Sequence, residues 1–223
     1  MFFILPVGDD NPRRHFPVVN LFLIAANVGV FLFYAFDTPD RAECFILRWG
    51  LVPASWRPET LVTSIFLHGG IAHLLGNMLF LWIAGDNVED RVGHIRYLLL
   101  YLFLGVAAGA AHVIFNPASL LPCVGASGAI SGVLAGYLVL FPGARIRFAF
   151  IFVIFRLFSF PMPALVAIGF WFLEQVFLAH LARVEAVTQV AYDAHIGGFS
   201  AGFIILLAAR MTGMVKGGTR RRG

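Results

Sequence analysis

Six long hydrophobic stretches constrain the fold of this chain more than any other feature. They cover residues 18–36, 61–83, 97–115, 124–141, 163–182 and 190–209. Each is long enough to cross a bilayer as a helix, which takes about 20 residues. Hydrophobic residues make up 60% of the 223 positions and charged residues only 13%, a composition that excludes a soluble globular protein. The sequence therefore predicts an all-α membrane protein, a bundle of six transmembrane helices.

The basic residues predict the orientation of this bundle. Lys and Arg gather at 13–14, 91–96, 145–156 and 210–222, whereas Arg41, Arg48, Arg57 and Arg183 fall on the other side. Basic residues favour the cytoplasmic side of a membrane, so both termini are expected there. The net charge of +4 then reflects topology and contact with anionic lipid, and gives no support to nucleic-acid binding.

The organisation expected along the chain is simple. Residues 1–16 form a short cytoplasmic segment, 17–212 the six-span domain and 213–223 a basic cytoplasmic tail. The stretch 148–160 is apolar, but Arg156 and the following prolines argue against a further span, and an interfacial or partly re-entrant loop is expected. An apolar start of six residues with no basic residue before it is not expected to be a signal peptide.

A serine and a histidine are the first candidates for chemistry. With six spans, Ser127 and His195 lie near the outer ends of spans 4 and 6, as the fourth and about the sixth residues of these spans, and at matching depth. Small residues recur every fourth position in both spans, and such residues let two helices approach closely; they are Gly128, Gly132 and Gly136, and Ala194, Gly198 and Gly202. A hydroxyl and a base in contact are what nucleophilic catalysis requires.

Span 2 carries a second polar cluster. His73 and Asn77 are four residues apart and share a helix face, and His68 precedes them. Side chains at this depth could hold a developing oxyanion, which is typically worth about 3–4 kcal/mol for each donor. Gly125 and Gly128, on either side of Ser127, leave room for close backbone approach.

Together these motifs resemble the rhomboid family of intramembrane serine proteases. They are His68-x4-His73-x3-Asn77, Gly125-Ala126-Ser127-Gly128 and Ala194-His195-Ile196-Gly197-Gly198, in the family's order. The resemblance implies that Ser127 is the nucleophile and His195 its general base, without a third carboxylate. It implies that His73, Asn77 and the Ser127 backbone N–H stabilise the oxyanion, with His68 in support.

The resemblance also covers residues away from the site. Glu89 and Arg91 resemble a structural charged pair at the inner end of span 2, and the loop 37–60 resembles the family's membrane-embedded loop. Ser131 stands where some members place an aromatic ring that packs on the histidine.

The function implied is cleavage of single-span membrane proteins near the outer face of the bilayer. Substrates would enter laterally, by way of span 5 and the outer loops. No metal or organic cofactor is implied, the partners are transmembrane substrates and the lipid bilayer, and no oligomeric state is predicted. The short termini favour a bacterial inner (plasma) membrane.

Several alternatives are weaker. A zinc protease needs two histidines four residues apart with an intervening Glu, which His68 and His73 lack. An aspartyl protease needs two carboxylates at one depth, but Asp86 and Asp193 are expected at opposite faces. A client-binding relative without activity stays open, although both Ser127 and His195 are present; a transporter has less support.

Three other residues lead to separate expectations. Asp193 should face away from His195, about 200° around the helix, and Glu174 should meet an internal polar group or line the cavity. Cys44 and Cys123 both fall on the outer side, as a disulfide or as free thiols.

Overall fold

The computed structural model describes residues 2–152, 155–185 and 190–217. Its helices are α1 (Val18–Ala35), α2 (Pro39–Trp49), α3 (Thr60–Thr63), α4 (Ile71–Val92), α5 (His94–Phe115), α6 (Ser127–Leu140), α7 (Ala164–Glu185) and α8 (Tyr192–Met211), with 3-10 turns η1 (Pro53–Ser55) and η2 (Ser64–Phe66). Its strands are β1 (Phe2–Asp9), β2 (Arg145–Phe152) and β3 (Phe155–Pro163).

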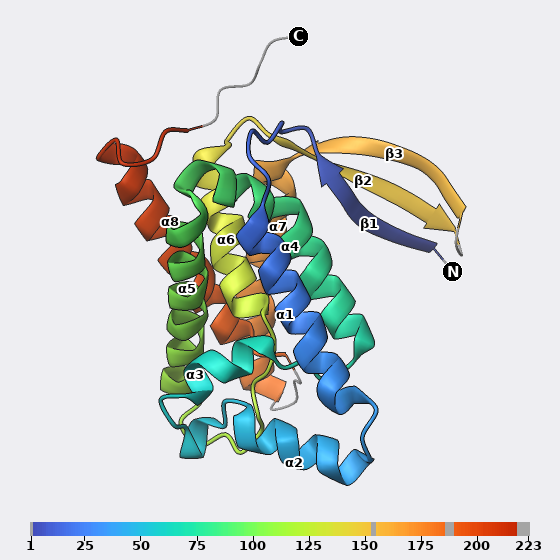
Figure 1. Cartoon of the computed structure of the whole chain (residues 1–223), viewed down its shortest axis with the longest axis vertical. Helices are drawn as coiled ribbons and strands as arrows, with labels where there is room; N and C mark the ends of the chain where they lie inside the picture. Colours follow the sequence, from blue (N-terminus) through green and yellow to red (C-terminus); the bar gives the residue numbers. More distant parts are fainter. Residues whose placement is uncertain (1, 153–154, 186–189, 218–223) are drawn as a thin grey trace.

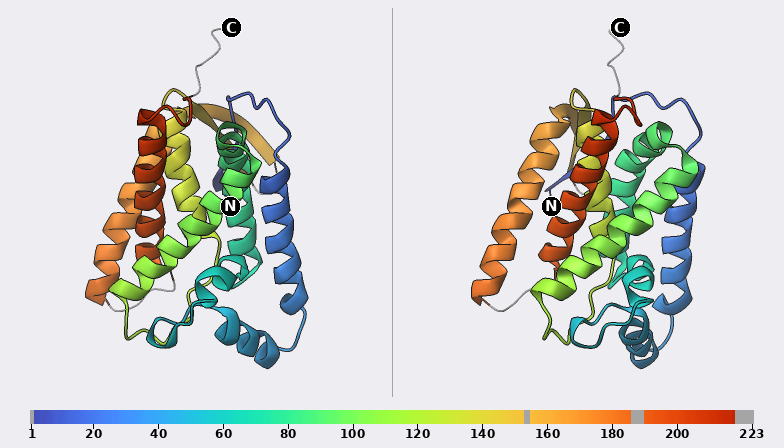
Figure 2. Two further views of the ribbon diagram at one scale, coloured as in Figure 1. Left: turned by 60° about the vertical axis from the view of Figure 1, so that its left-hand side comes forward. Right: turned by 90° about the vertical axis from the view of Figure 1, so that its left-hand side faces the viewer.

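Helix α6 is the centre of the bundle. The other long helices surround it, and the sheet projects to one side at the end opposite α2 and α3 (Figures 1 and 2). Every residue of α6 after Ser127 is buried. Because no face of α6 meets lipid, its glycines and alanines serve contact with other helices, above all with α8.

The described part of the chain supports a helical membrane bundle. Four of its helices are long and apolar enough to span a membrane (Val18–Ala35, His94–Phe115, Ala164–Ala182 and Tyr192–Met211), and the bent pair Thr60–Phe66 with Ile71–Val92 brings the number to five. Helix α6 is apolar but has only 14 residues. The count of six spans and the cytoplasmic termini stay predictions.

The continuous helix expected over 61–83 is wrong. The chain bends by 95° between η2 and α4, so His68 lies in the break. Gly69 and Gly70 follow it, and glycine is a poor helix former. The His68 backbone N–H and C=O both bond to the Tyr34 hydroxyl at 2.7 Å, which satisfies groups that a helix would otherwise pair.

The loop expected over 148–160 is also wrong, and with it the purely α-helical class. Strand β2 pairs antiparallel with both β1 and β3, in the order β1-β2-β3. Ile4, Phe150 and Phe158 stand opposite one another across the three strands, and the Phe150 and Phe158 rings stack at 5.2 Å. Such aromatic cross-strand pairs stabilise a sheet. An apolar cavity of about 140 Å³ separates the inner part of this sheet from α4, α6 and α7.

The loop between α1 and α4 closes the other end of the bundle. It holds α2, η1 and α3, and Leu51 pairs with Cys123 through two backbone hydrogen bonds of 3.0 and 2.8 Å. Cys44 and Cys123 are both free, which decides between the two states that the sequence allowed. Burial raises the pKa of the Cys123 thiol to about 12, so this thiol stays protonated and unreactive at neutral pH.

Candidate active site

Ser127 and His195 lie at the starts of two closely packed helices. Ser127 is the first residue of α6 and His195 the fourth of α8, because both helices begin later than the apolar stretches do. A Cβ on Gly198 would lie 2.0 Å from the Gly128 carbonyl oxygen, and one on Gly202 would lie 2.2 Å from that of Gly132. Only glycine permits this approach, so the predicted close contact of the two helices is confirmed.

The approach of the helices brings the two side chains into hydrogen-bond contact. The Ser127 Oγ lies 2.8 Å from the His195 Nε2. His195 is 9% exposed and Ser127 half-buried. Ser131, one turn further along α6, donates its hydroxyl to the Ser127 carbonyl at 2.6 Å. The distance between Ser127 Oγ and His195 Nε2 is the one that a serine nucleophile and its base need.

Helix α7 supplies two further partners of the His195 ring that the sequence pattern did not predict. Gln175 Oε1 lies 2.7 Å from His195 Nδ1, and the Trp171 ring centroid lies 5.9 Å from that of His195. The expectation for the adjacent Glu174 is wrong, because its side chain is exposed on the outer side of α7. The signal available in the sequence was an amide next to a carboxylate within an apolar stretch.

Two side chains of α4 converge on the chain just before Ser127. Gly125 has a φ of +124°, and a Cβ there would lie 2.7 Å from His73 Cε1 and 3.5 Å from Asn77 Nδ2. Asn77 is buried, and its Nδ2 has no hydrogen-bond partner in the part of the chain that the structure describes. Ser127 begins a helix, where a backbone N–H has no acceptor within the helix. His73 and Asn77 therefore both lie against Gly125, two residues before Ser127.

His68 stands behind these donors. Its side chain is fully buried, and its ring centroid lies 5.2 Å from that of His73 in an edge-to-face arrangement. The structure thus places His68 against His73 and not against Ser127.

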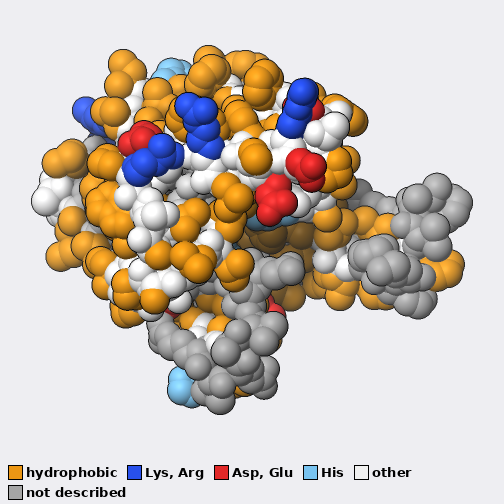
Figure 3. Space-filling view, turned by 90° about the horizontal axis from the view of Figure 1, so that it is seen from below, with side chains coloured by type: hydrophobic (Ala, Val, Ile, Leu, Met, Phe, Trp, Pro, Cys, Tyr) orange, Lys and Arg blue, Asp and Glu red, His pale blue; other side chains and the backbone are white. Residues whose placement is uncertain are grey.

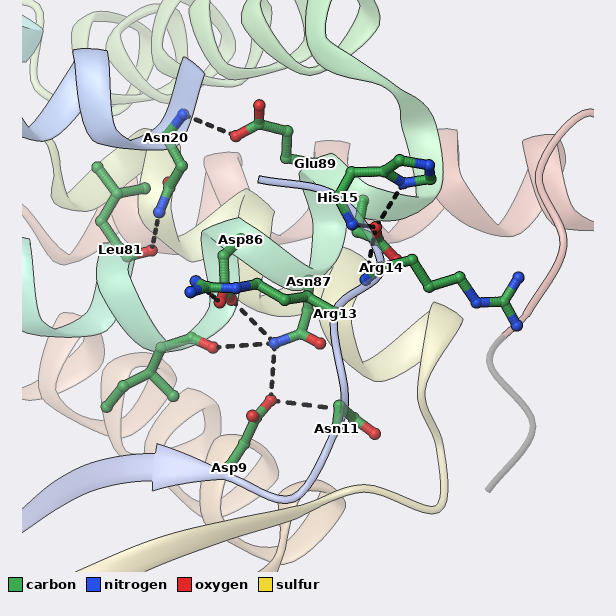
Figure 4. A network of polar contacts seen from close by, with 12 residues as sticks. Asp9, Asn11, Arg13, Arg14, His15, Asn20, Leu81, Asp86, Asn87 and Glu89 are labelled. Atoms are coloured by element: carbon green, nitrogen blue, oxygen red, sulfur yellow. Dashed lines mark hydrogen bonds and ion pairs between the residues drawn. The ribbon is translucent and has the colours of Figure 1, made fainter. Parts of the chain in front are cut away.

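Glu89 and Arg91 lie at the far end of α4. Glu89 is buried and accepts hydrogen bonds from the backbone N–H groups of Val19 and Asn20 at 2.9 and 2.7 Å, so it caps the start of α1 (Figure 4). A carboxylate at a helix N-terminus is stabilised by the helix dipole. Arg91 lies over the Phe141 ring at 5.2 Å. Among the described residues the two do not form an ion pair, since positions two apart on a helix face different ways.

The surroundings of the site contain few charges. Asp193 accepts a hydrogen bond at 3.0 Å from Asn116, the residue that follows α5, which agrees with the expectation that it faces away from His195. The end of the molecule that carries the site is mostly hydrophobic, with a few charged side chains on it (Figure 3). In the described ranges no group of three His, Cys, Asp or Glu is arranged to hold a metal ion.

Comparison with known proteins connects this arrangement to one family. The rhomboid domain matches residues 54–211. The chain is 36% identical over 163 residues to Rhomboid protease GluP of Bacillus subtilis, covering 73% of this chain and 27% of that protein. It is 32% identical over 194 residues to the mitochondrial Rhomboid protein 1 of Saccharomyces cerevisiae, with 82% and 50% covered.

A chloroplast protein is also similar. The chain is 40% identical over 134 residues to Rhomboid-like protein 11 of Arabidopsis thaliana, covering 60% of this chain and 46% of that one. The chain thus spans about a quarter to a half of the length of these curated relatives.

Proposed function

The chain belongs to the rhomboid family, and we propose that it is an intramembrane serine endopeptidase that uses Ser127 and His195 as a dyad. The observation that carries the proposal is the 2.8 Å contact between Ser127 Oγ and His195 Nε2. The contact is formed at the starts of two apolar helices, where a base and a hydroxyl would otherwise be costly to bury.

The first half of the reaction follows from this contact. Ser127 Oγ attacks the carbonyl carbon of the scissile bond while His195 Nε2 takes the hydroxyl proton. The carbonyl electron pair moves to its oxygen, and His73, Asn77 and the Ser127 backbone N–H donate to the oxyanion. The intermediate collapses by breaking the C–N bond, and His195 gives its proton to the leaving amine.

Water completes the cycle. It attacks the acyl carbon and gives a proton to His195; the ester C–O bond then breaks, the carboxylic acid product leaves, and His195 returns the proton to Ser127 Oγ. Gly125 contributes by its missing side chain, since any Cβ there would displace His73. His68 packs behind His73 as a supporting residue. The missing side chain of Gly128 leaves room for Ala108 of α5. Glu89 and Arg91 join the distant end of α4 to the start of α1 and to Phe141.

The substrates proposed are single-span membrane proteins cut near the outer face of the bilayer. A helix hides its carbonyls in i to i−4 hydrogen bonds, so segments with small, helix-breaking residues should be cut best. The apolar outer face of α7 offers a lateral route, since Leu173, Val176 and Phe177 are exposed on it. We further propose six spans with cytoplasmic termini, the division at residues 16 and 212, and a bacterial inner membrane as the location.

Cleavage by the purified full chain in detergent tests this function. A single-span substrate with a helix-breaking segment is incubated with the parent, with Ser127→Ala and with Ser200→Ala, whose serine lies exposed on α8. We expect the parent and Ser200→Ala to cut and Ser127→Ala to lose at least about 1,000-fold in kcat, as for removal of other serine nucleophiles.

Labelling with a fluorophosphonate probe separates the remaining outcomes. Labelling of Ser127 without cleavage would mean that the substrate is wrong and the nucleophile right. No labelling and no cleavage by the folded parent would favour a client-binding protein and overturn the proposal. Cleavage by Ser127→Ala would point to another catalytic group.

A further inference from the structure

We propose that Gln175 is a positioning residue that fixes the tautomer of the catalytic His195. The proposal rests on the proposed function, because it assigns a role toward the base of that dyad. It is carried by two contacts on opposite sides of one imidazole ring. Nδ1 lies 2.7 Å from the Gln175 Oε1, and Nε2 lies 2.8 Å from the Ser127 Oγ.

The chemistry of the amide oxygen decides what the first contact means. A carbonyl oxygen only accepts, so Nδ1 must carry the proton. A neutral imidazole has one N–H, which leaves the lone pair on Nε2 and directs it at the Ser127 hydroxyl. The opposite tautomer would present N–H to that hydroxyl and could not remove its proton. Gln175 therefore selects the form of His195 that acts as a base.

The contact between Gln175 and His195 is buried, so losing it would cost free energy. Gln175 is 5% exposed and His195 is 9% exposed. A buried amide or imidazole nitrogen without a partner costs free energy, so each side chain restrains the rotamer of the other. In serine hydrolases with a triad a third group orients the base in this way; here the group is a neutral amide, which orients the ring without adding a charge.

Two aromatic rings also contact the His195 ring, one from α7 and one from α8, where Tyr192 lies edge-on at 6.4 Å. Trp171 lies one turn before Gln175 on α7, and its ring is 5.9 Å from that of His195. Ser131 of α6 offers no ring, and its hydroxyl is used by the Ser127 carbonyl. The base is thus contacted by side chains of α7 and α8, whereas the nucleophile belongs to α6. Helix α7 also packs against α8 at this point, as the stacked Phe172 and Phe199 rings at 4.0 Å show.

The test combines a substitution series with a direct measurement of the tautomer. Gln175→Met keeps the length of the side chain and removes the acceptor, Gln175→Glu keeps an acceptor oxygen, and Glu174→Gln is the matched control on the exposed side of α7. Fluorophosphonate labelling of Ser127 and the kcat and KM for a single-span substrate are measured on the full chain, beside the temperature of unfolding.

We expect Gln175→Met to slow labelling and lower kcat about tenfold, the effect of one buried hydrogen bond, with KM unchanged. Gln175→Glu should recover most of the rate, and Glu174→Gln should match the parent. Equal labelling rates for a folded Gln175→Met and the parent would overturn the proposal.

Nitrogen-15 NMR of His195 decides the point even where a variant fails to fold or the parent lacks activity. We expect the folded parent to carry its proton on Nδ1, and Gln175→Met to give a mixture of tautomers. A proton on Nε2 in the parent would mean that the Gln175 amide is turned to donate, and the proposal would fall. A parent whose Ser127 is never labelled but whose Nδ1 is protonated would overturn the proposed function and leave the Gln175 contact standing.

Discussion

At the scale of single residues, Gly125 illustrates how an absent side chain shapes the site. Its φ of +124° lies in the region that favours glycine, and the space a Cβ would take is filled by His73. Asn77 approaches the same point with a buried amide nitrogen that has no partner in the described chain. A donor left unpaired in a folded protein costs free energy, which is acceptable where an oxyanion will pair with it.

Asn77→Ala therefore distinguishes an oxyanion donor from a structural residue. We expect kcat to fall by about 100-fold or more, while KM and the temperature of unfolding change little, because Nδ2 donates no hydrogen bond within the described part of the chain. Gly76→Ala, with no heavy atom within 4 Å of the new Cβ, is the control on the same helix. A large loss of stability with unchanged kcat would assign Asn77 a packing role instead.

At the scale of elements, the pair α6 and α8 determines whether the dyad exists. Their backbones meet at Gly132, Gly198 and Gly202, where added Cβ atoms would lie 2.0 to 2.7 Å from a backbone oxygen of the facing helix. Interiors as dense as crystals cannot absorb such an overlap without moving a backbone. The 2.8 Å contact between Ser127 and His195 thus depends on glycines one and two turns away.

Gly202→Ala tests this dependence at a distance from the reacting atoms. The new Cβ would meet the Gly132 carbonyl oxygen at 2.2 Å, and overpacking of this kind costs about 1–3 kcal/mol. We expect a lower temperature of unfolding and a loss of Ser127 labelling. Gly169→Ala on α7, where nothing lies within 4 Å, should keep both at the parent level or above it. Full labelling of Gly202→Ala would refute the coupling.

At the scale of the whole molecule, the N-terminal strand joins distant parts of the chain. Strand β1 pairs with β2, and Asp9 at its end accepts hydrogen bonds from Tyr137 of α6 and from Asn87 of α4. Figure 4 shows this network continuing through Asp86, which is paired with Arg13 at 3.2 Å. These hydrogen bonds join β1, α4 and α6 at the end of the molecule opposite Ser127.

The contribution of the Asp9 carboxyl to the stability of the protein depends on pH. Burial raises the pKa of the Asp9 carboxyl from 3.8 to about 6, against the lowering effect of the Tyr137 hydrogen bond. Between about pH 4 and pH 6 the native state holds a proton that the unfolded chain has lost, so the contribution of Asp9 to stability falls as pH rises through this interval.

We expect Asp9→Asn to flatten that part of the stability profile, measured as the temperature of unfolding from pH 4 to pH 7. Asp40→Asn, on the exposed α2, is the control; a profile for Asp9→Asn that still follows the parent would contradict the assignment.

The sequence by itself determined what depends on local pattern. Lengths of apolar sequence predicted helices close to α1, α5, α7 and α8, and repeated glycines predicted that α6 and α8 would touch. The grouping of Ser127 with His195, and of His73 with Asn77, followed from helix periodicity and from which spans begin on one side.

Only the tertiary structure decided the features that depend on contacts between distant segments. The break at His68 requires the Tyr34 hydroxyl, 34 residues away, and the sheet requires β1 to meet β2 across most of the chain. Gln175 stands next to Glu174 in an apolar stretch, and only the packing of α7 against α8 brings it to His195. Hydrophobic periodicity indicates which face of an element is buried, but not which element packs against that face. Packing against α8 is what made Gln175 part of the site.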